Sequence, residues 1–274
     1  MAGTLFVVAT PLGNLQDITL RALEVLKTVD LIAAEDTRRA RKLLNRFGVK
    51  VPVLSYWGPR EQSRADVLIK HLKEGRSVAL VSDAGTPAIC DPGRILVQRA
   101  VENDILVIPV PGPSALVAAL SASGLPSDRF VFLGYIPSKA GERQALFQSL
   151  ALETRTMVLY ETPHRILASL ADMANILGET REAVACRELT KVHEEILRGT
   201  LSFLVSSLEA REDILGEFVM VVAGREEGST VSEDEALQEM KQLLRQGVSR
   251  KDAARKLASL YGLSSKTLYD RSLE

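Results

Sequence analysis

Two loops of small, turn-forming residues carry the strongest chemical signal in this sequence. They span residues 82–93 and 111–115, and each follows a short apolar run, residues 78–81 and 106–110, typical of a buried strand. Loops at the carboxyl ends of parallel strands form the ligand crevice of open α/β sheets. Either loop alone would be typical of ordinary turns. Because both are rich in backbone donors, we predict that they share a pocket for a small molecule.

The composition excludes several other classes of protein. The chain has 274 residues, 46% of them hydrophobic and 25% charged, which is enough for two compact domains and too mixed for disorder. The apolar runs are short and interrupted by charge, so we expect no membrane span, no signal peptide and a cytoplasmic location. Cys90, Cys186 and the three histidines lack pairing or ligand spacing, so we expect neither a disulfide nor a metal site.

Strands and helices alternate through the first part of the chain. Gly48 and Gly75 each follow an amphipathic segment, where they would end a helix. The alternation favours a mainly parallel sheet covered on both faces. The pattern predicts strands over residues 4–10, 31–34, 51–54, 78–81 and 106–110, and helices over 17–27, 37–47, 61–74, 94–103 and 114–121.

A turn-rich stretch over residues 121–128 interrupts this alternation. Beyond it, strands over 130–135, 156–160, 182–186, 193–197 and 217–222, with helices over 142–150, 164–177 and 202–208, predict a second α/β domain with a mixed sheet. An acidic linker over 225–230 precedes a wholly helical segment. We therefore expect domains over residues 1–122 and 123–225 and a small helical segment over 231–274.

Several motifs, in the same order, resemble the tetrapyrrole methylase superfamily of S-adenosylmethionine-dependent enzymes. They lie at residues 10–15 with Asp17, 35–38, 82–93, 111–115, 160–165 and 187–191, and so extend over almost the whole chain. The resemblance implies the two-domain α/β fold of that superfamily, with a helix-turn-helix-like C-terminal segment, and a homodimer. Within the superfamily, the chain resembles the branch that methylates the ribose 2′-hydroxyl of a cytidine in the decoding centre of small-subunit (16S) ribosomal RNA.

Two loops differ from those of the porphyrin and corrin branch. That branch carries a glycine-richer first loop and a Gly-Gly-Asp-Pro type second loop, whereas this chain has Ala-Thr-Pro-Leu-Gly over residues 9–13 and Ser-Asp-Ala-Gly over residues 82–85. The difference disfavours a tetrapyrrole substrate. Two alternatives stay open: a methyltransferase acting on a tetrapyrrole or another small metabolite, and a non-enzymatic RNA-binding regulator.

S-adenosylmethionine presents a sulfonium, a zwitterionic amino-acid tail, a ribose and an adenine. A pocket for it needs backbone amides, a few carboxylates or hydroxyls, and an apolar slot, which the loops supply. By resemblance, the cofactor is lined from both domains by Pro11, Asp83, Ala84, Ile89, Ser114, Ala115, Thr162, Leu189 and Ala223.

Methyl transfer to a ribose hydroxyl is an in-line displacement that needs alignment of the reactants and removal of the hydroxyl proton. Four candidates for this chemistry face the expected cleft: Glu35, Asp36, Glu188 and Lys191. A carboxylate could accept the proton, and Lys191 could do so if its pKa is depressed. The same residues could instead form a salt-bridged cluster between the domains.

The net charge of −1 argues against a generally RNA-binding surface, but basic residues are concentrated locally. Residues 241–274 contain eight lysines or arginines and three acidic residues. Within this segment, Ser249 and Asp252 predict the capped start of a helix, and Gly262 precedes a second helix. This pattern is typical either of a helix-turn-helix or of a helical pair docked on the main body. The candidates for RNA contact are Arg38, Arg39, Arg41, Arg187, Arg250, Lys251 and Lys266.

Overall fold

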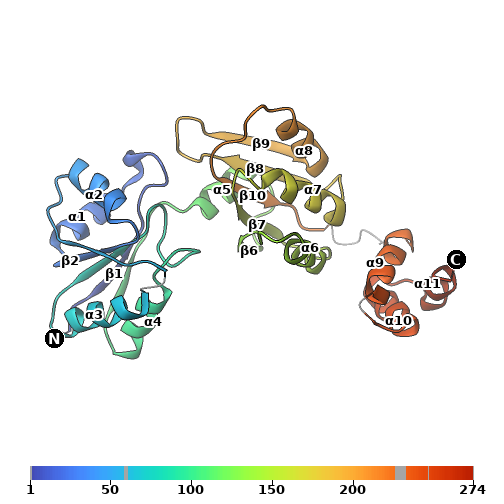
Figure 1. Ribbon diagram of the computed structural model, residues 1–274, viewed down its shortest axis with the longest axis horizontal. Helices are drawn as coiled ribbons and strands as arrows, with labels where there is room; N and C mark the ends of the chain where they lie inside the picture. The colour runs from blue at the N-terminus through green and yellow to red at the C-terminus, as the bar shows by residue number, and fades with distance from the viewer. Residues whose placement is uncertain (1, 59–60, 226–232, 246, 274) are drawn as a thin grey trace. The chain divides into compact units, whose positions relative to one another are not determined.

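The computed structural model describes residues 2–58, 61–225, 233–245 and 247–273. The chain divides into two compact units, Met1–Gly224 and Arg225–Glu274. The first unit contains two five-stranded sheets with helices packed on them, and the second is helical (Figure 1). The boundary expected between residues 122 and 123 lies within the first unit and stays a prediction. Apart from Arg225, the expected acidic linker and the start of the expected C-terminal segment lie outside the described residues.

The first sheet is entirely parallel, with the strand order β3-β2-β4-β1-β5. Its strands are β1 (Leu5–Val8), β2 (Leu31–Ala34), β3 (Val53–Ser55), β4 (Val78–Val81) and β5 (Val107–Val110). All four residues of β4 are buried, as expected for a strand covered on both faces. The carboxyl ends of the strands therefore meet at one edge, where residues 9–15, 35–36, 82–93 and 111–114 leave the sheet.

Helices cover both faces of this sheet, which confirms the prediction from the sequence. They are α1 (Leu20–Thr28), α2 (Thr37–Arg46), α3 (Glu61–Lys73) and α4 (Arg94–Glu102). The helices α3 and α4 pack on one face through residues such as Leu68 and Leu96, whereas α1 and α2 pack on the other through Leu26 and Leu44. Gly48 and Gly75, with φ of 67° and 87°, follow α2 and α3 as expected.

The helix expected over residues 17–27 begins three residues later than predicted. A 3₁₀ turn, η1 (Leu15–Asp17), comes first, and α1 begins only at Leu20. The reason is local: the Thr19 hydroxyl accepts the Ala22 N–H at 3.0 Å, so Thr19 caps a new helix and keeps an extended backbone.

The second sheet is mixed, as predicted, with the order β6-β7-β10-β8-β9. Its strands are β6 (Phe130–Tyr135), β7 (Thr156–Glu161), β8 (Glu182–Arg187), β9 (Glu195–Thr200) and β10 (Phe218–Val222). Only β6 and β7 pair in parallel. Helices α6 (Ala140–Ser149), α7 (Ile166–Leu177) and α8 (Leu201–Glu209) cover one face, and α5 (Ala115–Ser123) packs on the other.

The C-terminal unit has its own small core. Its helices are α9 (Glu233–Arg245), α10 (Arg250–Tyr261) and α11 (Ser265–Arg271). Their apolar faces meet through Met240, Leu257 and Leu268. The Ser249 hydroxyl accepts the Asp252 N–H at 3.2 Å, which confirms the capped start predicted for α10. Over the described residues, no helix in either unit is both long and apolar enough to cross a membrane.

Candidate active site

A pocket of ≈ 250 Å³ opens at the carboxyl edge of the first sheet and is completed by residues of the second sheet. Ten of the residues expected from the sequence line it: Glu35, Arg39, Asp83, Ala84, Ile89, Ser114, Ala115, Glu188, Leu189 and Lys191. The pocket therefore brings together residues from the ends of β2, β4, β5 and β8. The first unit supplies all of its walls.

Other expected residues do not line this pocket. In the first unit these are Pro11, Asp36, Arg38, Arg41, Thr162, Arg187 and Ala223. Arg250, Lys251 and Lys266 belong to the C-terminal unit. Arg187 is held by the second sheet itself, because its guanidinium donates to Glu195 at 3.0 Å and to the Leu215 carbonyl at 3.2 Å.

Hydrogen bonds fasten the three small-residue loops to one another. Thr10 and Gly85 exchange both backbone hydrogen bonds at 2.9 Å, and the Thr10 hydroxyl donates to the Ser82 carbonyl at 3.2 Å. The Thr86 hydroxyl donates to the Pro113 carbonyl at 3.1 Å. The base of the pocket is therefore fixed by backbone hydrogen bonds and by two short threonine side chains rather than by long, flexible ones.

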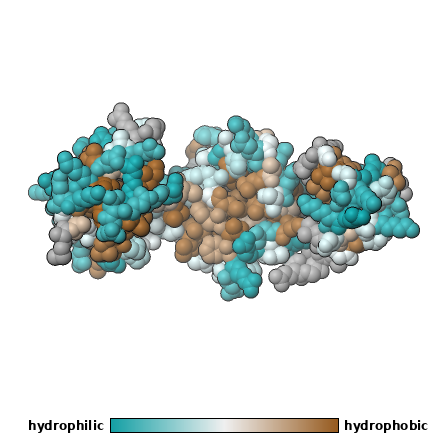
Figure 2. Space-filling view, turned by 90° about the horizontal axis from the view of Figure 1, so that it is seen from below, coloured by the Kyte–Doolittle hydropathy of each residue, from teal (hydrophilic) through white to brown (hydrophobic). Residues whose placement is uncertain are grey.

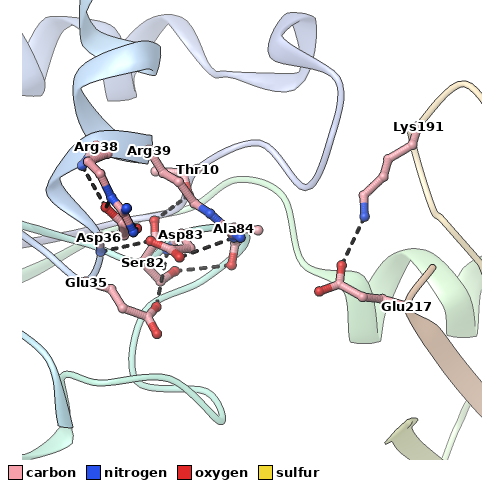
Figure 3. A network of polar contacts seen from close by, with 10 residues as sticks. All are labelled: Thr10, Glu35, Asp36, Arg38, Arg39, Ser82, Asp83, Ala84, Lys191 and Glu217. Atoms are coloured by element: carbon pink, nitrogen blue, oxygen red, sulfur yellow. Dashed lines mark hydrogen bonds and ion pairs between the residues drawn. The ribbon is translucent and has the colours of Figure 1, made fainter. Parts of the chain in front are cut away.

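Asp83 joins the ends of β2 and β4 (Figure 3). Its carboxylate accepts the Asp36 backbone N–H at 2.9 Å and pairs with Arg39 at 3.2 Å. The Asp83 N–H donates in turn to the Glu35 carboxylate at 3.4 Å. Burial, together with the negative charge of Asp83, raises the pKa of Glu35. Glu35 thus has more affinity for a proton than an exposed carboxylate has.

Asp36 caps helix α2 and is occupied by its own helix. Its carboxylate accepts the Arg38 backbone N–H at 2.7 Å and two hydrogen bonds from the Arg38 guanidinium. These bonds hold the pKa of Asp36 well below its usual range. The arrangement stabilises the helix start and leaves Asp36 with little tendency to accept a proton.

Lys191 and Glu188 form an ion pair on the opposite side of the pocket. The Lys191 ammonium donates to Glu188 at 2.7 Å and to Glu217 at 3.0 Å. Burial lowers the pKa of Lys191, but the two carboxylates outweigh it and the net pKa is raised. Burial raises the pKa of Glu188, but the hydrogen bonds from Lys191 and from the Glu217 N–H outweigh burial. The net pKa of Glu188 is therefore lowered. The depressed pKa that Lys191 needs to act as a base is therefore absent.

Two glycines make room for this ion pair. A Cβ atom on Gly216 would lie 2.3 Å from Glu188 Cγ, and one on Gly13 would lie 2.3 Å from Lys191 Cγ. Beside them, the Asn14 N–H donates to the Thr190 hydroxyl at 3.1 Å. The loop after β1 in the first sheet thus interlocks with the loop after β8 in the second.

Backbone strain is concentrated in the loops that line the pocket. Ala88 and Cys90 follow β4 with φ of 68° and 61°, and Glu188 and Thr190 follow β8 with φ of 51° and 67°. Non-glycine residues rarely take positive φ, and such residues cluster at functional sites. A fifth residue of this kind among the described ranges, Asp104, lies away from the pocket.

The sequence did not single out Asp91, Tyr135 or Tyr160, yet all three line the pocket. Burial, with a further contribution from the charge of Glu35, raises the pKa of Asp91 to about 6. The two tyrosine rings meet edge to face at 5.5 Å. Asp91 lay within the recognised loop at residues 82–93, and Tyr160 begins the recognised motif at residues 160–165. Tyr135 lies in strand β6, where sequence alone indicates only packing.

The motif at residues 160–165 has a structural role. Glu161 is buried, and its carboxylate pairs with Arg165 at 2.8 Å and accepts the Ser169 hydroxyl at 2.5 Å. The Thr162 N–H donates to the same carboxylate at 2.7 Å. These contacts hold the start of α7 against the end of β7.

Fold and pocket together define a class: α/β proteins with a pocket between the carboxyl edge of a parallel sheet and a second, mixed sheet. The sequence profile described as Tetrapyrrole (Corrin/Porphyrin) Methylases matches residues 4–205, and the chain belongs to this family. The resemblance predicted from the motifs is confirmed.

The chain is similar over nearly its whole length to proteins named ribosomal RNA small subunit methyltransferase I. It is 48% identical to that of Synechocystis sp. (strain ATCC 27184 / PCC 6803 / Kazusa), covering 99% of this chain and 98% of the relative. It is 44% identical to that of Escherichia coli O157:H7, covering 99% of this chain and 95% of the relative.

Solved structures share the fold at low sequence identity. The uroporphyrin-III-C-methyltransferase from Thermus thermophilus matches with a TM-score of 0.57 at 22% identity, over 81% of this chain and 94% of that one. A conserved hypothetical protein from Aeropyrum pernix K1 matches with a TM-score of 0.62 at 16% identity, over 98% of this chain and 96% of that one.

Proposed function

We propose that this protein is an S-adenosylmethionine-dependent methyltransferase that acts on the ribose 2′-hydroxyl of a cytidine in 16S ribosomal RNA of the small subunit. The observation that carries the proposal is the near-full-length similarity to relatives named for a ribosomal RNA small subunit methyltransferase. A ribosomal substrate places the reaction in the cytoplasm.

The pocket residues fit the proposed cofactor chemically. Carboxylates of Asp83 and Asp91 offer negative charge to a sulfonium and an amino group, and Ile89 and Leu189 offer apolar surface. Ala84 and Ser114 also line the pocket, and their backbone groups would hold the polar tail. Pro11, Thr162 and Ala223 are proposed by resemblance alone. The bound cofactor would supply an electrophilic methyl group on positive sulfur.

The chain's own contribution to the reaction is alignment and proton removal. We assign proton acceptance to Glu35, because its pKa is raised and its carboxylate lines the pocket. Glu188 and Lys191 hold each other as an ion pair and would position the substrate from the opposite wall. Arg39 pairs with Asp83 but keeps 69% of its side chain exposed, so it can also contact a phosphate.

The test is transfer of labelled methyl groups to small ribosomal subunits that lack the modification. Asp83→Arg and Ser114→Trp should abolish both transfer and cofactor binding in calorimetry, whereas Glu24→Arg, a charge reversal on the exposed side of α1, should preserve both. Transfer to a tetrapyrrole instead of to subunits would favour the metabolite enzyme. Tight RNA binding without any transfer would favour the regulator.

We further propose that the protein forms a homodimer. Apolar side chains are gathered over part of the second sheet (Figure 2). On the face where α5 packs, Val117, Phe130 and Tyr135 are exposed by 58%, 39% and 51%. Exposed apolar patches of this kind mark association sites. Sedimentation should give a dimer, and Val117→Glu with Phe130→Glu should dissociate it. A monomeric parent protein would refute the proposal.

A further inference from the structure

The C-terminal unit carries a groove of ≈ 330 Å³ between α10 and α11. Its lining is formed by three cations, one tyrosine and two small residues: Lys251, Ala254, Arg255, Ser265, Lys266 and Tyr269. The two small residues leave the groove open, and no carboxylate lines it.

The positions of these side chains follow from helix geometry. Residues three or four apart share a face of a helix, so Lys251 lies beside Arg255 on α10, and Lys266 beside Tyr269 on α11. Other faces of the same helices hold Leu257 and Leu268, which are buried in the core of the unit. The cations are therefore presented by packed helices rather than by mobile tails.

The three groove cations are available, in contrast to other arginines of the unit. Arg271 pairs with Glu233 and Asp234, at 3.0 Å and 2.6 Å, and Arg250 donates to the Ser272 carbonyl at 2.9 Å. Among the side chains that the structure describes in this unit, no groove cation is paired with a carboxylate. Arg250, an expected RNA contact, thus has a structural partner that the groove residues lack.

Tyr269 adds an aromatic surface next to these charges. It is 39% exposed and lines the groove together with the three cations. A cationic groove with an aromatic residue suits a single-stranded nucleic acid, whose phosphates meet the cations while an unstacked base lies on the ring. A base inside a duplex is already stacked and offers no free face.

We propose that the groove between α10 and α11 binds a single-stranded segment of RNA, with Lys251, Arg255 and Lys266 at phosphates and Tyr269 stacked on one base. This inference rests on the proposed function only in taking the RNA to be ribosomal. It adds Arg255 and Tyr269 to the expected RNA contacts. It does not include Arg250, which lies outside the groove.

The contribution of the cations can be measured from the salt dependence of binding. The full chain is titrated into a labelled single-stranded RNA oligonucleotide, followed by fluorescence anisotropy at several salt concentrations. Lys251→Gln with Lys266→Gln should lower the slope of log K against log salt by about 1.4, since each phosphate contact to a single strand contributes about 0.7. The control, Lys241→Gln with Lys256→Gln, removes two lysines outside the groove and should leave the slope unchanged. Equal effects in both pairs would overturn the proposal.

The stacking contact is tested separately. Tyr269→Ala should weaken binding of the same oligonucleotide roughly ten- to hundredfold without changing the salt slope, and Tyr269→Phe should restore it. An alanine variant that binds as well as the parent would eliminate the stacking contact. Tyr269→Phe binding as weakly as Tyr269→Ala would assign the effect to the hydroxyl and likewise overturn it.

Further measurements distinguish single-stranded RNA from other occupants of the groove. They also distinguish a failure of the groove proposal from a failure of the proposed function. Duplex RNA of the same length should compete poorly, and equal competition would refute the single-stranded assignment. Groove variants that bind RNA normally but lose affinity for whole subunits would point to a protein partner instead. A parent protein that binds RNA through the groove yet transfers no methyl group would refute the proposed function and leave the groove assignment standing.

Discussion

Three carboxylates reach the pocket from the ends of two neighbouring strands, and burial raises the proton affinity of two of them, Glu35 and Asp91. Asp83 is fixed by a backbone N–H and by Arg39, whereas the pKa values of Glu35 and Asp91 are raised, in both cases chiefly by burial. Pocket carboxylates whose pKa values are raised are typical of sites that perform acid–base work.

We expect Asp91→Asn to stabilise the protein at neutral pH. The pKa of Asp91 is about 6 in the folded protein and about 3.9 in an unfolded chain, so its contribution to stability is fully present below pH ~4 and is lost as the pH rises through ~6. Asparagine carries no charge to desolvate. The variant should melt above the parent at pH 7, and the difference should shrink towards pH 4. Asp128→Asn, which removes the same charge at an exposed position, serves as the control.

Glu35→Gln should lower kcat by about 10²- to 10⁴-fold while the affinity for cofactor and RNA changes little. Asp36→Asn serves as the control, because that carboxylate caps α2 and does not line the pocket. Single-turnover rates at saturating RNA and cofactor provide the measurement. Near-normal rates for Glu35→Gln would mean that alignment and proton transfer to solvent suffice.

At the scale of single elements, caps and interlocked loops fix the pocket's geometry. Asp36→Ala should reduce the free energy of unfolding by about 0.5–2 kcal/mol, because α2 loses the side chain that accepts its Arg38 N–H. Asp36→Ser, another good cap, should recover most of that loss. Urea denaturation measures both. Loss of turnover at unchanged stability would instead return Asp36 to the catalytic candidates.

Gly216→Ala should be more harmful than Gly178→Ala. Both glycines have positive φ, 92° and 105°, so each alanine strains the backbone by about 1–3 kcal/mol. Only at Gly216 would the new methyl group collide with a neighbour, Glu188, whereas nothing lies within 4 Å at Gly178. Thermal melts should show the extra cost, and turnover should fall for Gly216→Ala alone. Equal effects would mean that Glu188 moves aside freely.

Most elements could be predicted because apolar periodicity and capping residues are local signals. The helices ending at Gly48 and Gly75 and the Ser249 cap illustrate this. The strand expected from residue 193 begins only at Glu195, because residues 188–194 form the strained loop of the pocket. Apolar periodicity gives no information about a positive φ at residues such as Thr190. That backbone conformation depends on contacts with distant loops.

The pocket itself could be predicted only in part, for a related reason. Each small-residue loop is one continuous stretch of sequence, so Asp83 and Ser114 could be recognised as candidates for the pocket. Tyr160 and Glu217 reach the pocket only because the second sheet faces the first, and that arrangement is a property of the whole first unit. Burial, which sets the pKa of Asp91, is likewise tertiary.

At the scale of the whole molecule, cofactor binding and RNA binding should be separable. All residues of the pocket belong to the first unit, so removal of residues 231–274 should leave cofactor affinity within a few fold. Methylation of subunits should fall roughly tenfold or more at physiological salt, because the groove cations are lost. Calorimetry and labelled-methyl transfer measure the two effects. Full-rate methylation by the shortened protein would show that the C-terminal unit is dispensable.

The strand order of the first sheet has a consequence for the synthesis of the chain. The strand β1 lies between β4 and β5, so Leu5 finds its partners only in Val78 and Val107. At about 5–20 residues per second, this apolar strand leaves the ribosome several seconds before its first neighbour. During that interval the nascent chain exposes unpaired strand edges, which attract other chains. Completion of β4 is therefore the first step of synthesis that can cover an edge of β1.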